Sequence, residues 1–323
     1  MQIIRYNKIR SKPGKAFVDF LINSNKIKNM EYRSLNNYLK DTFNTKVYKI
    51  SINAGFTCPN RDGKLDNRGC IFCSGEGSGD FCESSALSVT EQIEEGKKRV
   101  SAKIREGGKY IAYFQAFTNT YAPVERLRAV FTEALVNPDI VALSVATRPD
   151  CLPDDVLSLL GELNEIKPVW VELGLQTIHP KTAEYIRRCY PLCVYDEAVS
   201  NLKKRNLTVI THVILGLPGE SEKDMLETVK YVCDGGIDGI KLQLLHVLKG
   251  TDLAKDYIEG KFECLSQDEY INLVIKCLEI IPDNIVIHRM TGDGNKKTLI
   301  APKWSSDKKK VLNALTKAIR SKK

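Results

Sequence analysis

The sequence contains no apolar run that approaches the roughly 20 residues needed to cross a bilayer. Its first ten residues are polar and basic, so the apolar segment of a secretory signal is also missing. Histidine is scarce, at four in 323 residues, and only one Cys-x-x-Cys motif is present, so a zinc site built from two paired motifs is not expected. Together these absences predict a protein that stays in the cytoplasm, has no membrane partner and keeps its ten cysteines reduced.

Acidic residues are scarce at both ends of the chain. Residues 1–50 carry 11 Lys and Arg against 3 Asp and Glu, and residues 295–323 carry 10 against 1. The middle of the chain is mildly acidic, with 27 basic and 36 acidic side chains. Basic ends favour contact with a phosphate backbone or an acidic partner, although solvated lysine-rich termini would give the same pattern.

From residue 47 onward, short β-branched runs alternate with longer amphipathic segments. This alternation predicts strand–helix units around a parallel sheet. The predicted strands are 47–53, 110–115, 140–146, 169–176, 209–215 and 239–246, with a further one at 285–290. The predicted helices are 90–105, 123–135, 154–166, 180–188, 195–204, 221–233, 267–280 and 304–320. Six units are too few to close an eight-unit barrel, so an open doubly wound sheet and a partial barrel are both compatible with the pattern.

Three cysteines lie on one loop directly after the first predicted strand. Gly, Asn, Asp and Pro residues separate Cys58, Cys70 and Cys73, and such residues let a backbone fold around an inorganic centre. Core packing does not explain these thiols, because a polar loop has no core to fill. Three thiolates can hold a [4Fe–4S] cluster and leave one iron open to a small chelating ligand. We therefore predict a cluster rather than a zinc ion, and no tight set among the other cysteines predicts a second one.

Four further motifs lie at the ends of predicted strands: Tyr113-Phe-Gln115-Ala-Phe-Thr118-Asn119, Thr147-Arg148-Pro-Asp150, Glu172-Leu-Gly-Leu-Gln176-Thr and His212-Val-Ile-Leu-Gly216-Leu-Pro218-Gly219. With the cysteine loop, they make residues 45–300 similar to the radical S-adenosylmethionine superfamily. The chain resembles a small bacterial subfamily in the branch that contains the catalytic subunit of Elongator and oxygen-independent coproporphyrinogen oxidase.

This resemblance implies a fold, an activity and a set of cofactors. The implied fold is α/β, a partial (βα)6 barrel over residues 46–294, with a basic helical extension at 1–45 and a basic segment ending in a helix at 295–323. The implied activity is reductive cleavage of S-adenosylmethionine to a 5′-deoxyadenosyl radical. The implied cofactors are a [4Fe–4S] cluster and S-adenosylmethionine, reduced by a low-potential donor such as flavodoxin or ferredoxin.

The resemblance also suggests which residues meet S-adenosylmethionine. Gln115 and Asn119 occupy the place where many relatives contact its amino group, and Arg188 aligns with an arginine that contacts its carboxylate. Phe72, between two of the cysteines, is placed to pack near the adenine, or alternatively anchors the loop.

Residues on the later strands are assigned to the cofactor ribose or to the substrate. Glu172 and Gln176 lie four apart on one strand and so share a face, with ordinary strand-end hydrogen bonding as the alternative. His212 is more simply explained as a satisfied core group than as a catalyst. His246 and Lys249 follow the sixth strand, where polar groups of a substrate are expected.

Three hypotheses remain for the reaction. The subfamily has been linked to wobble-uridine maturation, which implies conversion of 5-carboxymethylaminomethyluridine in tRNA to 5-aminomethyluridine, with the basic ends on tRNA phosphates. Because the chain ends soon after the predicted barrel, no acetyltransferase domain is expected. The second hypothesis is radical oxidation of a small anionic, porphyrinogen-like metabolite. The third is a non-catalytic iron–sulfur protein, which formation of deoxyadenosine would exclude.

Overall fold

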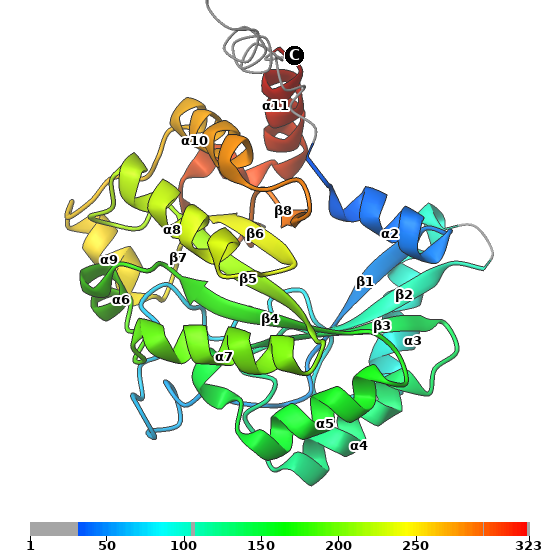
Figure 1. Cartoon of the computed structure of the whole chain (residues 1–323). Helices are drawn as coiled ribbons and strands as arrows, with labels where there is room; N and C mark the ends of the chain where they lie inside the picture. Colours follow the sequence, from blue (N-terminus) through cyan, green and yellow to red (C-terminus); the bar gives the residue numbers. More distant parts are fainter. Residues whose placement is uncertain (1–31, 105–106, 293, 322–323) are drawn as a thin grey trace, which may run out of the picture.

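The computed structural model describes residues 32–104, 107–292 and 294–321 (Figure 1). Residues 1–31, which make up most of the predicted N-terminal extension, lie outside this part of the chain. None of the helices that the structure describes is long and apolar enough to cross a membrane.

Seven parallel strands form the central sheet, and their order in the sheet follows their order in the chain. The six predicted strands and the further one at 285–290 are therefore confirmed, with small shifts at their ends. The strands are β1 (Val47–Ile52), β2 (Lys109–Phe114), β3 (Ile140–Thr147), β4 (Val169–Gln176), β5 (Thr208–Leu215), β6 (Gly239–Leu244) and β8 (Val286–Arg289).

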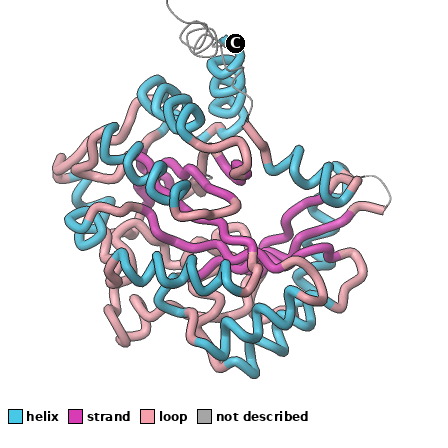
Figure 2. The backbone as a smooth tube through the Cα atoms, in the orientation of Figure 1, coloured by secondary structure: helices cyan, strands magenta, loops and turns pink. Residues whose placement is uncertain are grey.

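The sheet is a partial barrel and not a doubly wound sheet. A doubly wound sheet reverses its strand order at one point, whereas this sheet never reverses. Because parallel crossovers are right-handed, a constant direction places the connecting helices on one side, and the sheet curls away from them (Figure 2). The connecting helices are α3 (Val89–Val100), α4 (Val124–Leu135), α5 (Asp154–Asn164), α6 (Pro180–Tyr185), α7 (Leu192–Lys204), α8 (Glu222–Asp234) and α10 (Gln267–Ile280).

Helix boundaries follow local chemistry. Ser221 and Ser266 each form a capping box, with Asp224 and Glu269 respectively, at the predicted starts of α8 and α10. The predicted helix over 180–188 is wrong in its second half, because α6 ends at Tyr185 and the backbone that follows turns left-handed at Arg187, with φ 57°.

The outer face of the sheet is the apolar core. Side chains from every central strand pack against the connecting helices, as where the Phe114 and Phe131 rings meet edge to face with centroids 5.0 Å apart. The inner face begins with an apolar layer at the amino ends of the strands. There α2 (Leu35–Phe43) places Leu39 in a cluster with Trp170 and Ile210, which closes the bottom of the half-barrel.

Three elements after β6 were not predicted. A short ribbon pairs β7 (Val247–Leu248) with β9 (Leu299–Ala301), and α9 (Asp252–Ile258) lies between them in the chain. Two- and three-residue strands are too short to give a periodic signal. The predicted final helix is confirmed as α11 (Lys308–Ser321), which packs along α10 on the outer side of the barrel (Figure 1).

Candidate active site

A layer of charged side chains crosses the inside of the half-barrel above the apolar bottom layer. Its centre is Glu172 on β4, which is fully buried. Lys49 Nζ and Ser144 Oγ each donate to Glu172 Oε1 at 2.7 Å. His212 Nε2 lies 2.7 Å from Oε2, which also accepts a close hydrogen bond from Lys241 Nζ. The Glu172 carboxylate is therefore shared by four internal partners contributed by β1, β3, β5 and β6.

Electrostatics fixes the charge states in this layer. Burial alone would raise the pKa of Glu172, but Lys241 and Lys49 hold it well below its ordinary value, so the carboxylate is ionised. Burial and the charge of Lys241 lower the pKa of His212 to about 4, so the imidazole is neutral at pH 7 and donates from Nε2. Lys241 also donates to Tyr113 Oη at 3.1 Å. The layer is a paired charge network that forms the floor of a cavity.

The cysteine loop lies over this floor. Cys58, Cys70 and Cys73 all line one cavity of about 160 Å³, together with Glu172 and Lys241. Burial raises the pKa of Cys70 to about 12 and also raises that of Cys73, so each is a thiol until a metal displaces its proton.

Hydrogen bonds from Asn60 and Arg61 orient the cysteine loop. Asn60 is fully buried, and its Nδ2 donates to the Arg187 carbonyl at 2.7 Å and to Cys70 Sγ at 3.5 Å. Arg61 Nη2 donates to the carbonyls of Cys73 and Ser74 at 3.0 and 2.6 Å. These bonds hold the Cys70 sulfur and fix the backbone at Cys73 and Ser74.

The donor set fits an iron–sulfur cluster and not a single zinc ion. Tetrahedral zinc at about 2.3 Å from each sulfur would hold its ligands within roughly 4 Å of one another. Among the described residues, the three cysteine sulfurs do not all lie within 4.8 Å of one another. Of the described residues that line the cavity, only these three carry a thiol, so a cubane held here has one iron without a protein ligand.

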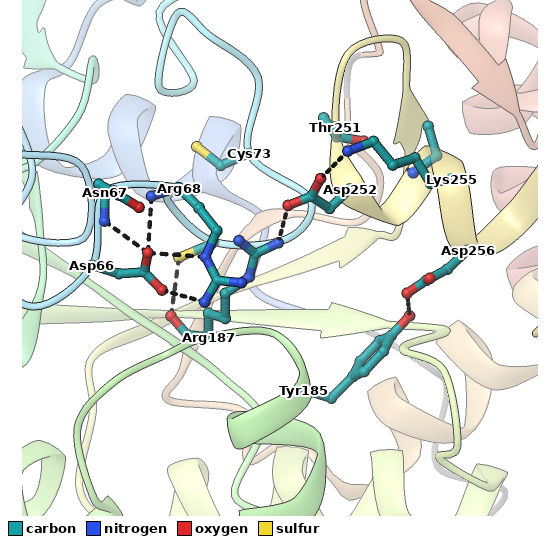
Figure 3. Close-up of polar contacts among 12 residues, drawn as sticks. Asp66, Asn67, Arg68, Cys73, Tyr185, Arg187, Thr251, Asp252, Lys255 and Asp256 are labelled. Carbon is teal, nitrogen blue, oxygen red and sulfur yellow. Dashed lines mark hydrogen bonds and ion pairs between the residues drawn. The ribbon is translucent and has the colours of Figure 1, made fainter.

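Two later segments, residues 185–187 and α9, are bound to each other beside the cysteine loop (Figure 3). Arg187 Nη2 donates to Asp252 of α9 at 2.6 Å, and Tyr185 Oη donates to Asp256 of the same helix at 2.7 Å. The Leu253 amide donates to the carbonyl of Ile71, between Cys70 and Cys73, at 3.0 Å. The unpredicted helix α9 is thus part of the support of the cysteines.

Most of the predicted cofactor residues meet at this cavity. Phe72, Gln115 and Gln176 line it and also line a second, adjoining cavity of about 310 Å³. Gln115 is held by Ser51 Oγ, which donates to its Oε1 at 2.9 Å, and donates in turn to the Ser78 carbonyl at 2.9 Å. Gln176 has φ 73°, and its buried Oε1 has no hydrogen-bond partner in the described structure. An acceptor left in this state favours a ligand with an N–H or O–H group.

Arg188 and Asn119 differ in their placement. Arg188 lines the first cavity, donates to the carbonyls of Thr177 and Tyr190, and lies over the Tyr190 ring at 4.7 Å. Asn119 lines neither cavity, because its fully buried Nδ2 donates to the carbonyls of Phe114 and Ala146. Asn119 thus joins the ends of β2 and β3, and its buried Oδ1 has no hydrogen-bond partner in the described structure. Its contact with the cofactor stays a prediction.

The charged layer was largely missed from the sequence, although a signal for it exists. Side chains alternate between the two faces of a strand, so Lys49, Ser144 and Lys241 interrupt apolar strands at positions that all face inward. A Lys inside a strand that is buried on both faces needs a buried carboxylate. Glu172 was identified, but its partners Lys49 and Lys241 were not.

Comparison with known proteins agrees with this geometry. The family model described as Radical SAM superfamily matches residues 67–232, and the one described as Radical_SAM C-terminal domain matches residues 237–321. The Bacillus subtilis protein YtqA is 50% identical over 288 residues, which cover 89% of this chain and 89% of YtqA. A Methanocaldococcus jannaschii tRNA uridine(34) acetyltransferase is 28% identical over 156 residues, 47% of this chain and 28% of that protein.

Among solved structures, the Methanocaldococcus infernus Elp3 with an N-terminal deletion has the same fold. It superimposes with a TM-score of 0.63 at 18% identity, covering 84% of this chain and 63% of that one. The half-barrel, the three-thiol cavity and the family matches together establish that this chain belongs to the radical SAM superfamily and is an S-adenosylmethionine-dependent enzyme with a [4Fe–4S] cluster.

Proposed function

We propose that the protein modifies tRNA, converting 5-carboxymethylaminomethyluridine at the wobble position to 5-aminomethyluridine. The observation that carries this proposal is the match between this chain and a relative that acts, by its name, on uridine 34 of tRNA. A distant match of this kind supports the substrate class, and the side-chain conversion is our own inference from the chemistry below.

The reaction balances with one S-adenosylmethionine as the two-electron oxidant. The cluster and S-adenosylmethionine, when bound, supply a 5′-deoxyadenosyl radical that takes one hydrogen atom from carbon. Loss of hydrogen from the methylene between the substrate's amine and carboxylate leaves a radical that both groups stabilise. Loss of one further electron, which would return to the cluster, and of the proton on nitrogen gives an imine, and water then releases glyoxylate and the aminomethyl product. The sum is substrate, S-adenosylmethionine and water giving product, glyoxylate, methionine, 5′-deoxyadenosine and one proton.

The residues of this chain have definite roles in the proposal. Cys58, Cys70 and Cys73 hold the cluster, and Phe72, Gln115, Gln176 and Arg188 are the cofactor contacts, while Glu172 organises the floor beneath them. The connecting helices and α2 close the outer side and bottom of the half-barrel, which shields the radical from bulk solvent on those sides. A low-potential donor such as flavodoxin or ferredoxin would supply the electron that starts the cycle.

A basic edge near the second cavity supports a tRNA substrate. Leu248 lines that cavity, and the next residue, Lys249, is exposed and pairs through its backbone with Thr298. Lys296 and Lys297 are also exposed, and no ion pair among the described residues joins any of these three side chains. We name Lys249, Lys296 and Lys297 the ribbon lysines. They are placed to meet phosphates flanking a nucleotide that enters the cavity.

The C-terminal helix is less suited to that role. α11 buries Val311, Leu315 and Ile319 on the outer side of the barrel, and none of its residues lines either cavity. Its lysines therefore provide a matched control for the ribbon lysines.

The proposed substrate is tested by nucleoside mass spectrometry of tRNA from a strain that lacks the gene. We expect 5-carboxymethylaminomethyluridine to accumulate and aminomethyl-type uridines to disappear, and the wild-type gene but not Cys58→Ala to restore them. Unchanged tRNA nucleosides in the deletion strain would refute the proposal and favour a small anionic substrate.

Binding provides a second test. Changing the three ribbon lysines to Glu should lower tRNA affinity about tenfold and reduce the slope of log affinity against log salt by roughly two. The control variant, with Lys309, Lys310 and Lys317 changed to Glu, has the same charge change and should bind tRNA nearly as the wild type does. Equal losses in both variants would show that only overall charge matters.

A further inference from the structure

The second cavity has an unusual pair of fixed charges. Of the described residues that line it, Arg289 is the only Lys or Arg and Asp80 is the only carboxylate. No ion pair joins these two side chains in the described structure. Asp80 Oδ2 accepts from Ser74 Oγ at 3.1 Å, and its other oxygen has no hydrogen-bond partner among the described residues.

Arg289 differs from the other cations of the site. Lys241 pairs with Glu172, and Arg148 pairs with Asp150 through Nε and Nη2 at 2.9 and 2.7 Å. Arg61 and Arg188 donate to backbone carbonyls. Arg289 has neither kind of partner among the described residues, although it lines both cavities.

The position of Arg289 makes this lack of a partner costly. Arg289 on β8 is the register neighbour of Lys241 on β6, so two cations lie side by side. The charge of Arg289 disfavours the charged forms of Lys241 and His212 and lowers the pKa of both, although burial is the larger cause for each. A guanidinium held beside other cations without a carboxylate of its own indicates a place for an anion that the protein does not supply.

We propose that Arg289 and Asp80 bind the two charged ends of a carboxymethylamino group, Arg289 the carboxylate and Asp80 the protonated secondary amine. This inference rests on the proposed function and deepens it, because it assigns residues to the part of the substrate that reacts. One methylene separates amine and carboxylate, so fixing both ends fixes the carbon that loses hydrogen. A substrate that lacks either charge leaves Arg289 or Asp80, both half-buried, without its partner in the cavity, which gives the site its specificity.

The test compares three nucleosides bound to holoenzyme with S-adenosylmethionine present. The probes are 5-carboxymethylaminomethyluridine, 5-methylaminomethyluridine without the carboxylate, and 5-carboxymethyluridine without the amine. We expect the wild-type enzyme to bind the first at least about tenfold more tightly than either of the others.

Substitutions of Arg289 and Asp80 test the carboxylate contact and the amine contact separately. Arg289→Gln should abolish the preference over 5-methylaminomethyluridine, Arg289→Lys should keep part of it, and Asp80→Asn should abolish the preference over 5-carboxymethyluridine. Lys309→Gln, which removes one exposed charge on α11 outside both cavities, should keep both preferences. Affinity for S-adenosylmethionine should stay close to that of the wild type in all four variants.

The outcomes separate this inference from the proposed function. If the wild-type enzyme converts the modified tRNA but Arg289→Gln and Asp80→Asn do so with unchanged KM, the inference is wrong and the function stands. If the preferences depend on Arg289 and Asp80 but tRNA is not converted, the charge assignment stands and the function is wrong. If Arg289→Gln weakens S-adenosylmethionine binding as much as nucleoside binding, Arg289 serves the cofactor and the inference is overturned.

Discussion

The two faces of the central sheet use the same seven strands for opposite purposes. The outer face is largely apolar and meets helices, while the inner face carries Lys, Glu, His, Gln and Arg over a single apolar bottom layer. An outer-face side chain acts through the area that it buries. An inner-face side chain acts through a specific hydrogen-bond or ion-pair partner. Substitutions on the two faces should therefore lower stability or activity for different physical reasons.

The largest expected effect is on cluster binding, and it distinguishes a cysteine of the inner cavity from a cysteine of the outer core. Cys70→Ala removes a ligand from the three-thiol cavity, and we expect it to lose the reconstituted cluster and all reductive cleavage of S-adenosylmethionine. Cys277→Ala, in the fully buried outer core, should cost about 1 kcal/mol of stability and keep its iron. Iron analysis and deoxyadenosine assays check both. Full cluster absorbance in Cys70→Ala would break the comparison.

The next effect concerns stability. Glu172→Ala leaves Lys241 and Lys49 near each other without their carboxylate, and should lower the free energy of unfolding by about 3–5 kcal/mol. Phe131→Ala on the outer face should cost a similar amount, about 3–5 kcal/mol, through a cavity. Only the inner-face loss should be reversible by further changes, because Glu172→Leu with Lys241→Met and Lys49→Met removes the carboxylate and both of its ammonium partners. Urea denaturation of these three variants and the wild type measures this, and a triple variant as unstable as Glu172→Ala would contradict it.

A smaller effect depends on pH. An unfolded histidine binds its proton near pH 6.5, whereas native His212 does so at about pH 4. Between these values the unfolded state holds more protons, so stability falls as the pH is lowered from 6.5 to 4. The shift corresponds to roughly 3 kcal/mol. Urea melts at several pH values should show a shallower slope for His212→Gln. The remaining slope comes from His288 and from carboxylates such as Glu172, whose pKa values are also lowered. Identical slopes would show that His212 is not buried in neutral form.

The two faces were also unequally predictable. The outer face follows from periodicity, so the strands and most helices were located from β-branched runs and capping residues such as Ser266. The cysteines were located because thiols on a polar loop have no structural reason to be there. Partners on the inner face come from strands far apart in the chain, as with Lys49 and Glu172, so no local pattern pairs them. Motif position alone also did not reveal that the Asn119 amide donates to the carbonyls of Phe114 and Ala146.

The short C-terminal elements were the least predictable. α9 has seven residues, and its importance lies in contacts with Ile71 and Arg187 that are distant in sequence. The importance of the β7–β9 ribbon likewise follows only from its position beside the second cavity. Tertiary placement, and not local propensity, determines what these segments do.

The most direct test of the account follows one hydrogen atom. tRNA bearing 5-carboxymethylaminomethyluridine with deuterium at the methylene next to the carboxylate is incubated with reduced holoenzyme and S-adenosylmethionine. The account predicts 5′-deoxyadenosine carrying one deuterium, formed in step with 5-aminomethyluridine and glyoxylate. Deoxyadenosine without deuterium, or tRNA that keeps its carboxymethyl group while S-adenosylmethionine is cleaved, would contradict it.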